Sequence, residues 1–151
     1  MGLPGSGKST WIRDNKFHAL SSDHVRHLLS DDEDNQKIHR LVFGTLRYLV
    51  RRRIEAGMPV TYVDATSIAA WERRSWIKLA GLLGCEIEAV FFDTPLDLCL
   101  ERNASRKRVV PPEVIRSMSN RMVRPTTEEG FSRVTVVPAT VAAPLAKAKP
   151  E

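Results

Sequence analysis

The segment GLPGSGKS, residues 2–9, constrains the fold of this chain more than any other stretch. It matches the pattern G-x-x-x-x-G-K-[ST], in which the glycines let successive backbone N–H groups turn toward one set of phosphate oxygens. In such a loop Lys8 reaches the β- and γ-phosphates of a nucleotide and the Ser9 hydroxyl ligates magnesium. The positive end of a following helix adds to the anion site. The motif therefore predicts ATP and Mg²⁺ as ligands, held by Gly2, Pro4, Gly5, Ser6, Gly7, Lys8, Ser9 and Thr10.

Hydrophobic periodicity alternates between helix and strand spacing along the chain. Strands are expected at residues 17–20, 60–64, 88–93 and 133–137, and helices at 9–14, from 22, around 38–50, at 69–83, from 95 to about 105, and from 111. Strands separated by helices imply an α/β fold with a parallel sheet covered on both faces, the three-layer α/β/α arrangement of a P-loop NTPase. The expected inner helix faces carry Ile38, Leu41, Val42, Thr45, Leu46, Leu49 and Val50, and Val114, Ile115, Met118 and Met122.

The strand that should precede the phosphate loop is missing from the sequence, since only Met1 lies before Gly2. Such a strand is central in this architecture, and its loss would leave two neighbouring strands with unpaired edges. We expect residues 1–137 to form an N-terminally truncated kinase domain, although another segment filling the vacant position is an alternative. Residues 138–151 are rich in Ala, Pro and Lys without periodicity and are expected to be disordered.

Composition narrows the class of protein. The chain has 151 residues, of which 42% are apolar, enough for one domain with a core, and no apolar run reaches the length of a membrane span. Cys85 and Cys99 lack C-x-x-C spacing and are interpreted as core thiols, so a cytoplasmic protein without a membrane partner is predicted. The net charge of +5 permits a polyanionic partner without requiring one, and nothing in the sequence indicates an oligomeric state.

Asp64 ends the expected strand 60–64 and is the second predicted magnesium residue. At the carboxyl end of a buried strand it would lie near the phosphate loop. The alternative is an ordinary helix-capping aspartate in the segment DATS. Ala65 follows it where mechanical ATPases place a glutamate that activates water, so the sequence favours transfer to a bound hydroxyl over hydrolysis.

The acceptor side of such a reaction needs a base and several cations. Asp23 begins a helix just after the second strand, with Arg26 three residues later on the same face. Arg102, Arg106 and Arg108 cluster in and before a basic loop that suits a lid over phosphates. An N-capping ion pair and a solvated basic loop are the respective alternatives.

The segments GLPGSGKST, SSDHVRHLLSDDEDNQ, VDAT and ERNASRKR resemble the 5′-OH polynucleotide kinase domain of bacterial RNA-repair enzymes. The resemblance implies that Asp23 is the general base for a nucleic acid 5′-hydroxyl, that Arg26 contacts the acceptor phosphate, and that Arg102 and the lid arginines hold ATP. It departs at Ser67, where the family has Asn, and in a lid that is one residue shorter. A small-molecule or toxin-like kinase and an inactive ATP-binding module are the alternative functions.

Overall fold

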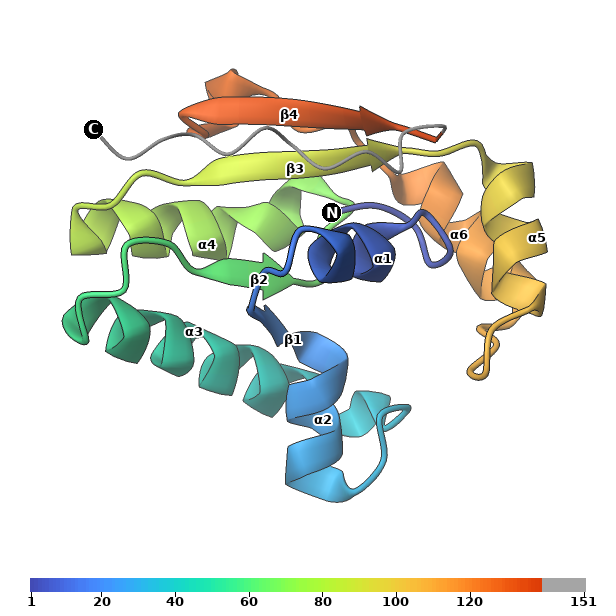
Figure 1. Cartoon of the computed structure of the whole chain (residues 1–151), viewed down its shortest axis with the longest axis horizontal. Coiled ribbons are helices and arrows are strands. Elements are labelled where there is room, and N and C mark those ends of the chain that lie inside the picture. Colours follow the sequence, from blue (N-terminus) through green and yellow to red (C-terminus); the bar gives the residue numbers. More distant parts are fainter. Residues whose placement is uncertain (140–151) are drawn as a thin grey trace.

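The computed structural model describes residues 1–139 (Figure 1). The helices are α1 (Lys8–Asp14), α2 (Ser22–Ser30), α3 (His39–Glu55), α4 (Ala70–Leu83), α5 (Leu96–Ala104) and α6 (Pro112–Arg121), with the 3-10 turns η1 (Gln36–Ile38) and η2 (Thr127–Glu129). The strands are β1 (Ala19–Ser21), β2 (Tyr62–Asp64), β3 (Glu88–Asp93) and β4 (Arg133–Pro138). The predicted α/β class of the P-loop NTPases is confirmed.

The strands form two parallel pairs rather than one continuous ladder. β1 pairs with β2, and β3 pairs with β4, both in parallel register. Met1 and Gly2 lie between the pairs: the Met1 amine donates to the Val90 carbonyl, the Phe92 N–H donates to the Met1 carbonyl, and the Gly2 N–H donates to Thr66. These bonds are what connects the two halves of the sheet at its centre.

The position of Met1 between the two strand pairs changes the pKa of its amine. Burial is the main reason that its pKa is lowered from 8.0 to about 5, and the nearby charge of Lys8 adds to the effect. Below its folded pKa the amine would be a desolvated cation between two strands, which is unfavourable. The amine is therefore neutral near pH 7, where an exposed one is largely charged. The prediction that residues 1–137 form a kinase domain truncated before the phosphate loop stays a prediction.

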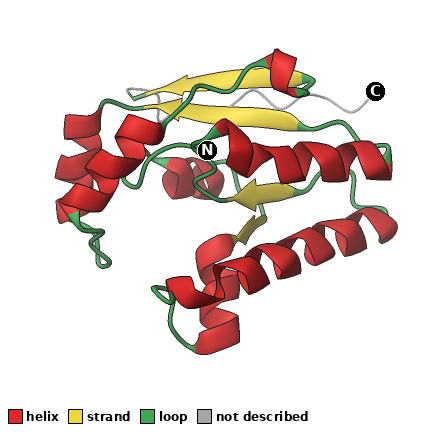
Figure 2. Ribbon diagram, turned by 180° about the vertical axis from the view of Figure 1, so that it is seen from behind, coloured by secondary structure: helices red, strands yellow, loops and turns green. Residues whose placement is uncertain are grey.

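Helices lie on both sides of the sheet. α1 lies in front of the strands in Figure 1, whereas α4 lies in front of them in the reverse view of Figure 2. Trp11 of α1 packs on Phe92 and Val137 of the β3–β4 pair. Val42 and Leu46 of α3 pack with Val25 of α2 and Trp76 of α4 over the β1–β2 pair, and a third cluster joins Leu3 of the phosphate loop to Cys99 and Ile115.

Several boundaries and faces differ from the predictions. The strand expected from residue 17 begins at Ala19, because the Phe17 N–H still bonds to Ile12 in the turn that ends α1. The strand expected from residue 60 begins at Tyr62, because Val60 is exposed. Leu41 is also wrongly predicted as core: it is 57% exposed, since Val42 and Leu46 occupy the centre of the buried stripe. Val114 is likewise exposed and faces the cavity described below.

The remaining sequence predictions concern the cysteines, the membrane and the tail. Cys99 is buried and Cys85 is half-buried, and both thiols are free. Among the described helices none has the length and hydropathy needed to cross a bilayer. The expected tail begins at Pro138, which closes β4, and its residues 140–151 lie outside the described part of the chain.

Candidate active site

The phosphate loop is held closed by its own lysine. The Lys8 ammonium donates to the Gly2 and Leu3 carbonyls, each at 2.8 Å, and lies 3.4 Å from the Ser6 hydroxyl. Burial lowers the pKa of Lys8 from 10.5 to about 8, and the negative charge of Asp64 opposes this shift. The charged form of Lys8 is therefore only moderately favoured near neutral pH, and a bound phosphate would stabilise it.

Two contacts from β3 and α5 fix the shape of the loop. Gly5 has φ +81°, and a β-carbon on it would lie 2.4 Å from the Cys99 carbonyl oxygen, so this residue must be glycine. Thr94, buried just after β3, donates its hydroxyl to the Ser6 carbonyl at 3.0 Å. Gly7 adopts a left-handed conformation immediately before α1, whose N-terminus thus opens onto the same space.

One cavity of about 760 Å³ joins almost all of the predicted site residues. Its walls include residues 4–10 of the loop, Asp23, Arg26, Asp64, Arg102, Arg106 and Arg108. Gly2 is the exception, because it is buried against Phe92 and bonded to Thr66. The cavity also extends to Trp11, Asn15 and Val137 at one end and to Gln36, His39 and Phe43 at another. The fold thus brings residues from the first and last thirds of the chain to one chamber.

Asp23 and Arg26 form an ion pair inside this cavity. The Ser21 hydroxyl caps α2, and Asp23 lies in its first turn. Arg26 Nη1 donates to Asp23 Oδ1 at 3.0 Å, and the Arg26 side chain is only 5% exposed against 49% for Asp23. Arg26 Nε has no hydrogen-bond partner among the described residues. The pair therefore has a buried cation that still offers a donor and a carboxylate that faces the cavity.

Arg108 connects the basic loop to this pair. Its Nη1 donates to Asp23 Oδ2 at 3.0 Å, its Nε donates to Asp34 at 2.8 Å, and its Nη2 donates to the Glu33 carbonyl at 3.2 Å. These partners, with the charge of Glu33, raise the pKa of Arg108 against the opposing effect of burial. Both carboxylate oxygens of Asp23 are thus engaged by guanidinium groups. We call this set of contacts, from Arg108 to Asp23, Glu33 and Asp34, the arginine latch.

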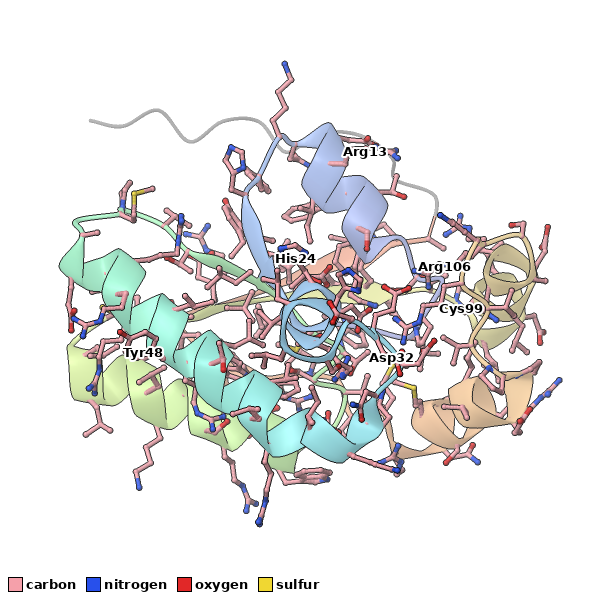
Figure 3. All side chains as sticks on the ribbon, turned by 90° about the horizontal axis from the view of Figure 1, so that it is seen from below. Arg13, His24, Asp32, Tyr48, Cys99 and Arg106 are labelled. Atoms are coloured by element: carbon pink, nitrogen blue, oxygen red, sulfur yellow. The ribbon has the colours of Figure 1, made fainter. Side chains whose placement is uncertain are left out.

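The other two lid arginines, Arg102 and Arg106, do not take part in the latch contacts described above. In Figure 3, Arg106 comes from the loop after α5 that also contains the latch residue, and Asp32 comes from the α2–η1 connection opposite. Arg106 is near enough to Lys8 to lower its pKa slightly, and Arg102 donates to the Ala139 carbonyl at 3.3 Å. Both line the cavity. Their separate roles toward individual phosphates stay predictions.

Asn103 joins the two ends of the lid loop, and the sequence did not predict this role. Asn103 is 1% exposed, and its amide donates to the Val110 carbonyl while accepting from the Val110 N–H, at 2.8 and 3.0 Å. This pair of bonds ties residues 104–109 into a loop of fixed base. A buried asparagine near the end of a helix is the available sequence signal, but its partner lies beyond the loop.

Arg73 was also missed. It is 1% exposed, pairs with both carboxylate oxygens of Glu129 at 2.6 and 2.7 Å, and donates to the carbonyls of Ser67, Ile68 and Val123. Arg73 therefore fixes the segment after β2, on which Thr66 and Ile68 face the cavity. Nothing in the local sequence distinguishes it from its exposed neighbour Arg74.

Ser9 and Asp64 are the residues that suit a magnesium ion. Both line the main cavity and also a second, acidic recess that contains Asp23 and Asp31. A hydroxyl and a carboxylate are hard oxygen ligands, and Mg²⁺ in nucleotide sites takes few protein ligands and completes its shell with water and phosphates. The donor set fits that ion, while no cluster of three or more His, Cys, Asp or Glu residues suited to a self-sufficient metal site occurs among residues 1–139.

Comparison with known proteins supports the kinase chemistry that the phosphate loop predicts. Residues 1–125 match a protein-family model described as an AAA domain. L-seryl-tRNA(Sec) kinase of Methanococcus maripaludis is 26% identical to this chain over 136 residues, which amounts to 84% of this chain and 52% of that protein. The chain thus spans about half the length of this relative. Neither match is to a polynucleotide kinase of RNA repair, so that narrower resemblance stays a prediction.

Proposed function

Since the chain belongs to the AAA domain family and has a P-loop kinase domain, we propose that it transfers the γ-phosphate of ATP to an acceptor hydroxyl, with Asp23 as the general base. The observation that carries this proposal is the single cavity that holds the phosphate loop, the Asp23–Arg26 pair and the lid arginines. A nucleotide-binding module without an acceptor would not need the Asp23–Arg26 pair. Ala65, which is buried directly after Asp64, offers no carboxylate to activate water.

The donor half of the proposed site is built on α1 and β4. ATP phosphates would lie over the loop amides, with Lys8 leaving the Gly2 and Leu3 carbonyls to pair with them. The nucleoside would extend toward Trp11, Asn15 and Val137. Mg²⁺, held by Ser9 and Asp64, would neutralise phosphate charge. Arg102 and Arg106 would stabilise the charge that develops on the transferred group.

The acceptor half is built on α2. The acceptor oxygen attacks the γ-phosphorus, the bond from that phosphorus to the β-phosphate bridging oxygen breaks, ADP leaves, and the acceptor proton passes to Asp23. Arg26, fixed by burial, orients the carboxylate through Oδ1. Arg108 must leave Oδ2 for the acceptor hydroxyl to approach that oxygen, so we propose that the arginine latch opens during the reaction cycle.

The 5′-hydroxyl of a polynucleotide is our first candidate for the acceptor. Its support is the resemblance of the α2 and lid segments to 5′-OH polynucleotide kinases, together with the net charge of +5. A seryl hydroxyl on a tRNA is the second candidate, because the 26% identical relative is an L-seryl-tRNA(Sec) kinase. In both candidates the reacting hydroxyl belongs to a nucleic acid or to a group attached to one, and a small alcohol is the alternative class.

The decisive experiment is incubation with γ-labelled ATP and Mg²⁺ in the presence of a 5′-hydroxyl oligonucleotide, a seryl-tRNA or a panel of small alcohols. Asp23→Asn should still bind ATP, no more weakly than wild type because it also loosens Arg108, and should lose about 10²–10⁴-fold in rate because the proton acceptor is removed. Asp97→Asn, the same change at an exposed position outside the cavity, is the matched control and should behave as wild type. Full activity of Asp23→Asn would refute the assigned base, and absence of label on every acceptor would refute the transferase.

A further inference from the structure

The wall of the cavity also includes residues outside the phosphate loop and the Asp23–Arg26 pair, and the space beside them is treated as one compartment that ATP chemistry does not require. This compartment, which we call the acceptor lobe, is lined by Gln36, His39, Phe43, Ile68, Met118 and Arg121. These residues come from η1, the start of α3, the segment after β2, and α6. None belongs to the phosphate loop or to the Trp11–Val137 end, and α3 packs directly against α2, which bears Asp23. The lobe therefore adjoins the side from which an acceptor would reach the base.

Two aromatic rings form one wall of the acceptor lobe. His39 and Phe43 are one turn apart on α3, with ring centroids 4.5 Å apart and planes inclined by 32°. Phe43 is half-buried and supported from behind by Trp76 at a centroid distance of 6.3 Å, whereas His39 is exposed. On an ordinary helix surface a pair of this kind would add little to helix stability. Lining a cavity, it also offers a rigid surface on which a flat ring can stack.

The other walls define the chemistry of the ligand. Ile68 and Met118 supply apolar surface, and the Met118 thioether is a favourable neighbour for an aromatic ring. Gln36 can both donate and accept hydrogen bonds, and Arg121 can donate several. A flat ring with apolar faces and an edge of donors and acceptors satisfies all of these groups, and a nucleobase has that chemistry.

We propose that the acceptor lobe binds the nucleobase of the nucleotide that carries the accepting hydroxyl, stacked against His39 and Phe43. This inference rests on the proposed kinase function and narrows the acceptor to one with a base next to the reacting hydroxyl. Base stacking on aromatic side chains is sequence-tolerant, because every base has a π-face. The lobe thus recognises the presence of a terminal base more than its identity.

The test compares two 5′-hydroxyl oligonucleotides that differ only in their terminal residue, one with a normal base and one abasic. Stacking of about 1–3 kcal/mol predicts that the normal acceptor is preferred by about 5- to 150-fold in kcat/KM. His39→Ala should remove much of this preference by weakening use of the normal acceptor, while use of the abasic acceptor and the KM for ATP stay unchanged. Equal use of the two acceptors by the wild-type protein would overturn the inference.

Two further variants separate stacking from stability. Phe43 packs against the core, so Phe43→Leu keeps its bulk while removing the ring, and its effect should again be confined to the base-bearing acceptor. Tyr48→Ala is the matched control: Tyr48 is an exposed ring on the same helix, 55% exposed, and Figure 3 shows it well along α3 from the α2–η1 connection that carries Asp32. It does not line the cavity and should change neither acceptor. Equal losses with both acceptors in the His39 and Phe43 variants would overturn the stacking role.

Equilibrium binding of the same two labelled oligonucleotides, measured by fluorescence anisotropy, keeps the inference separate from the reaction. Binding needs no turnover, so a base-dependent affinity that His39→Ala abolishes would support the lobe even if no acceptor became phosphorylated. In that case the proposed function would fail and the site would stand. Phosphorylation of both acceptors without a binding preference would support the proposed kinase function and contradict base recognition by the acceptor lobe.

Discussion

The arginine latch makes a quantitative prediction about ATP affinity. If Arg108 serves the ATP phosphates, as the lid arrangement suggests, it must first leave Asp34, and that exchange lowers the apparent affinity for ATP. The Arg108 side chain is 24% exposed and Asp34 is 68% exposed, with nitrogen–oxygen distances of 2.5 and 2.8 Å. Charge-assisted bonds of good geometry at such a partly exposed site are worth about 1 kcal/mol, which corresponds to about fivefold in a dissociation constant.

Asp34→Asn should therefore tighten ATP binding by about fivefold, because it removes one competitor for the guanidinium and leaves the phosphate loop untouched. Isothermal titration calorimetry with a non-hydrolysable ATP analogue measures the change directly. Asp31→Asn is the matched control: it removes the same charge from the same connection, and asparagine suits the left-handed conformation at that position, where φ is +53°. The difference in ATP affinity between the Asp34 and Asp31 variants should become smaller at high salt. Equal affinities in wild type and Asp34→Asn, or weaker binding in the variant, would refute the exchange.

Three further predictions concern stability, the loop and pH. Arg73→Met should lower the free energy of unfolding by about 3–5 kcal/mol in urea denaturation, because it leaves Glu129 and three backbone carbonyls without their donor; Arg74→Met, at the exposed neighbour, should be nearly neutral. Since Arg73 lowers the pKa of Glu129 below its ordinary 4.5, the stability from this pair should be full above about pH 4.5 and be lost as the pH falls through the folded pKa. Gly5→Ala should abolish ATP binding, because its β-carbon would lie 2.4 Å from the Cys99 carbonyl oxygen. Gly84→Ala, at φ +64° with open space around it, is the control and should cost about 1 kcal/mol of stability while leaving ATP affinity intact. Retained ATP affinity in the Gly5 variant would contradict the packing of the loop on α5. Finally, the Lys8 pKa of about 8 predicts that ATP affinity is constant below that pH and falls by up to about tenfold per pH unit above it, as the ammonium becomes neutral; Lys8→Arg should remove the slope, and an unchanged slope in that variant would assign the titration to another group.

The sequence predicted the local parts of the site well because they depend on short-range pattern. A glycine-rich turn followed by Lys8 and Ser9 defines most of the loop within a few residues, and the structure places residues 4–9 on the cavity wall, whereas Gly2 and Leu3 are buried. The ion pair of Asp23 and Arg26 follows from i, i+3 spacing on one helix, and the structure shows it at 3.0 Å. Element types were predictable for the same reason, with β3 matching its expected residues.

What the sequence could not predict depends on which distant segments meet. Arg108 was expected to face ATP, but its partners lie more than 70 positions away on the acceptor side, where Asp23 and Asp34 attract it. Leu41 fits the helical repeat and yet is exposed, because the width of the buried stripe is set by how α2 and α4 lie against α3. Arg73 looks like a surface residue until the carbonyls of Ser67 and Val123 converge on it.

By itself, the sequence determined the phosphate loop and with it the expectation of nucleotide chemistry, since the motif is encoded in eight consecutive residues whose glycines favour that turn. The tertiary structure alone decided which distant groups meet around that loop: the arginine latch on Asp23, the hydrogen bonds of Asn103 to Val110 at the base of the lid, and the pair of rings of His39 and Phe43. Conformational preference acts over a few neighbouring residues, whereas these contacts exist only where burial of apolar surface has brought separate helices together.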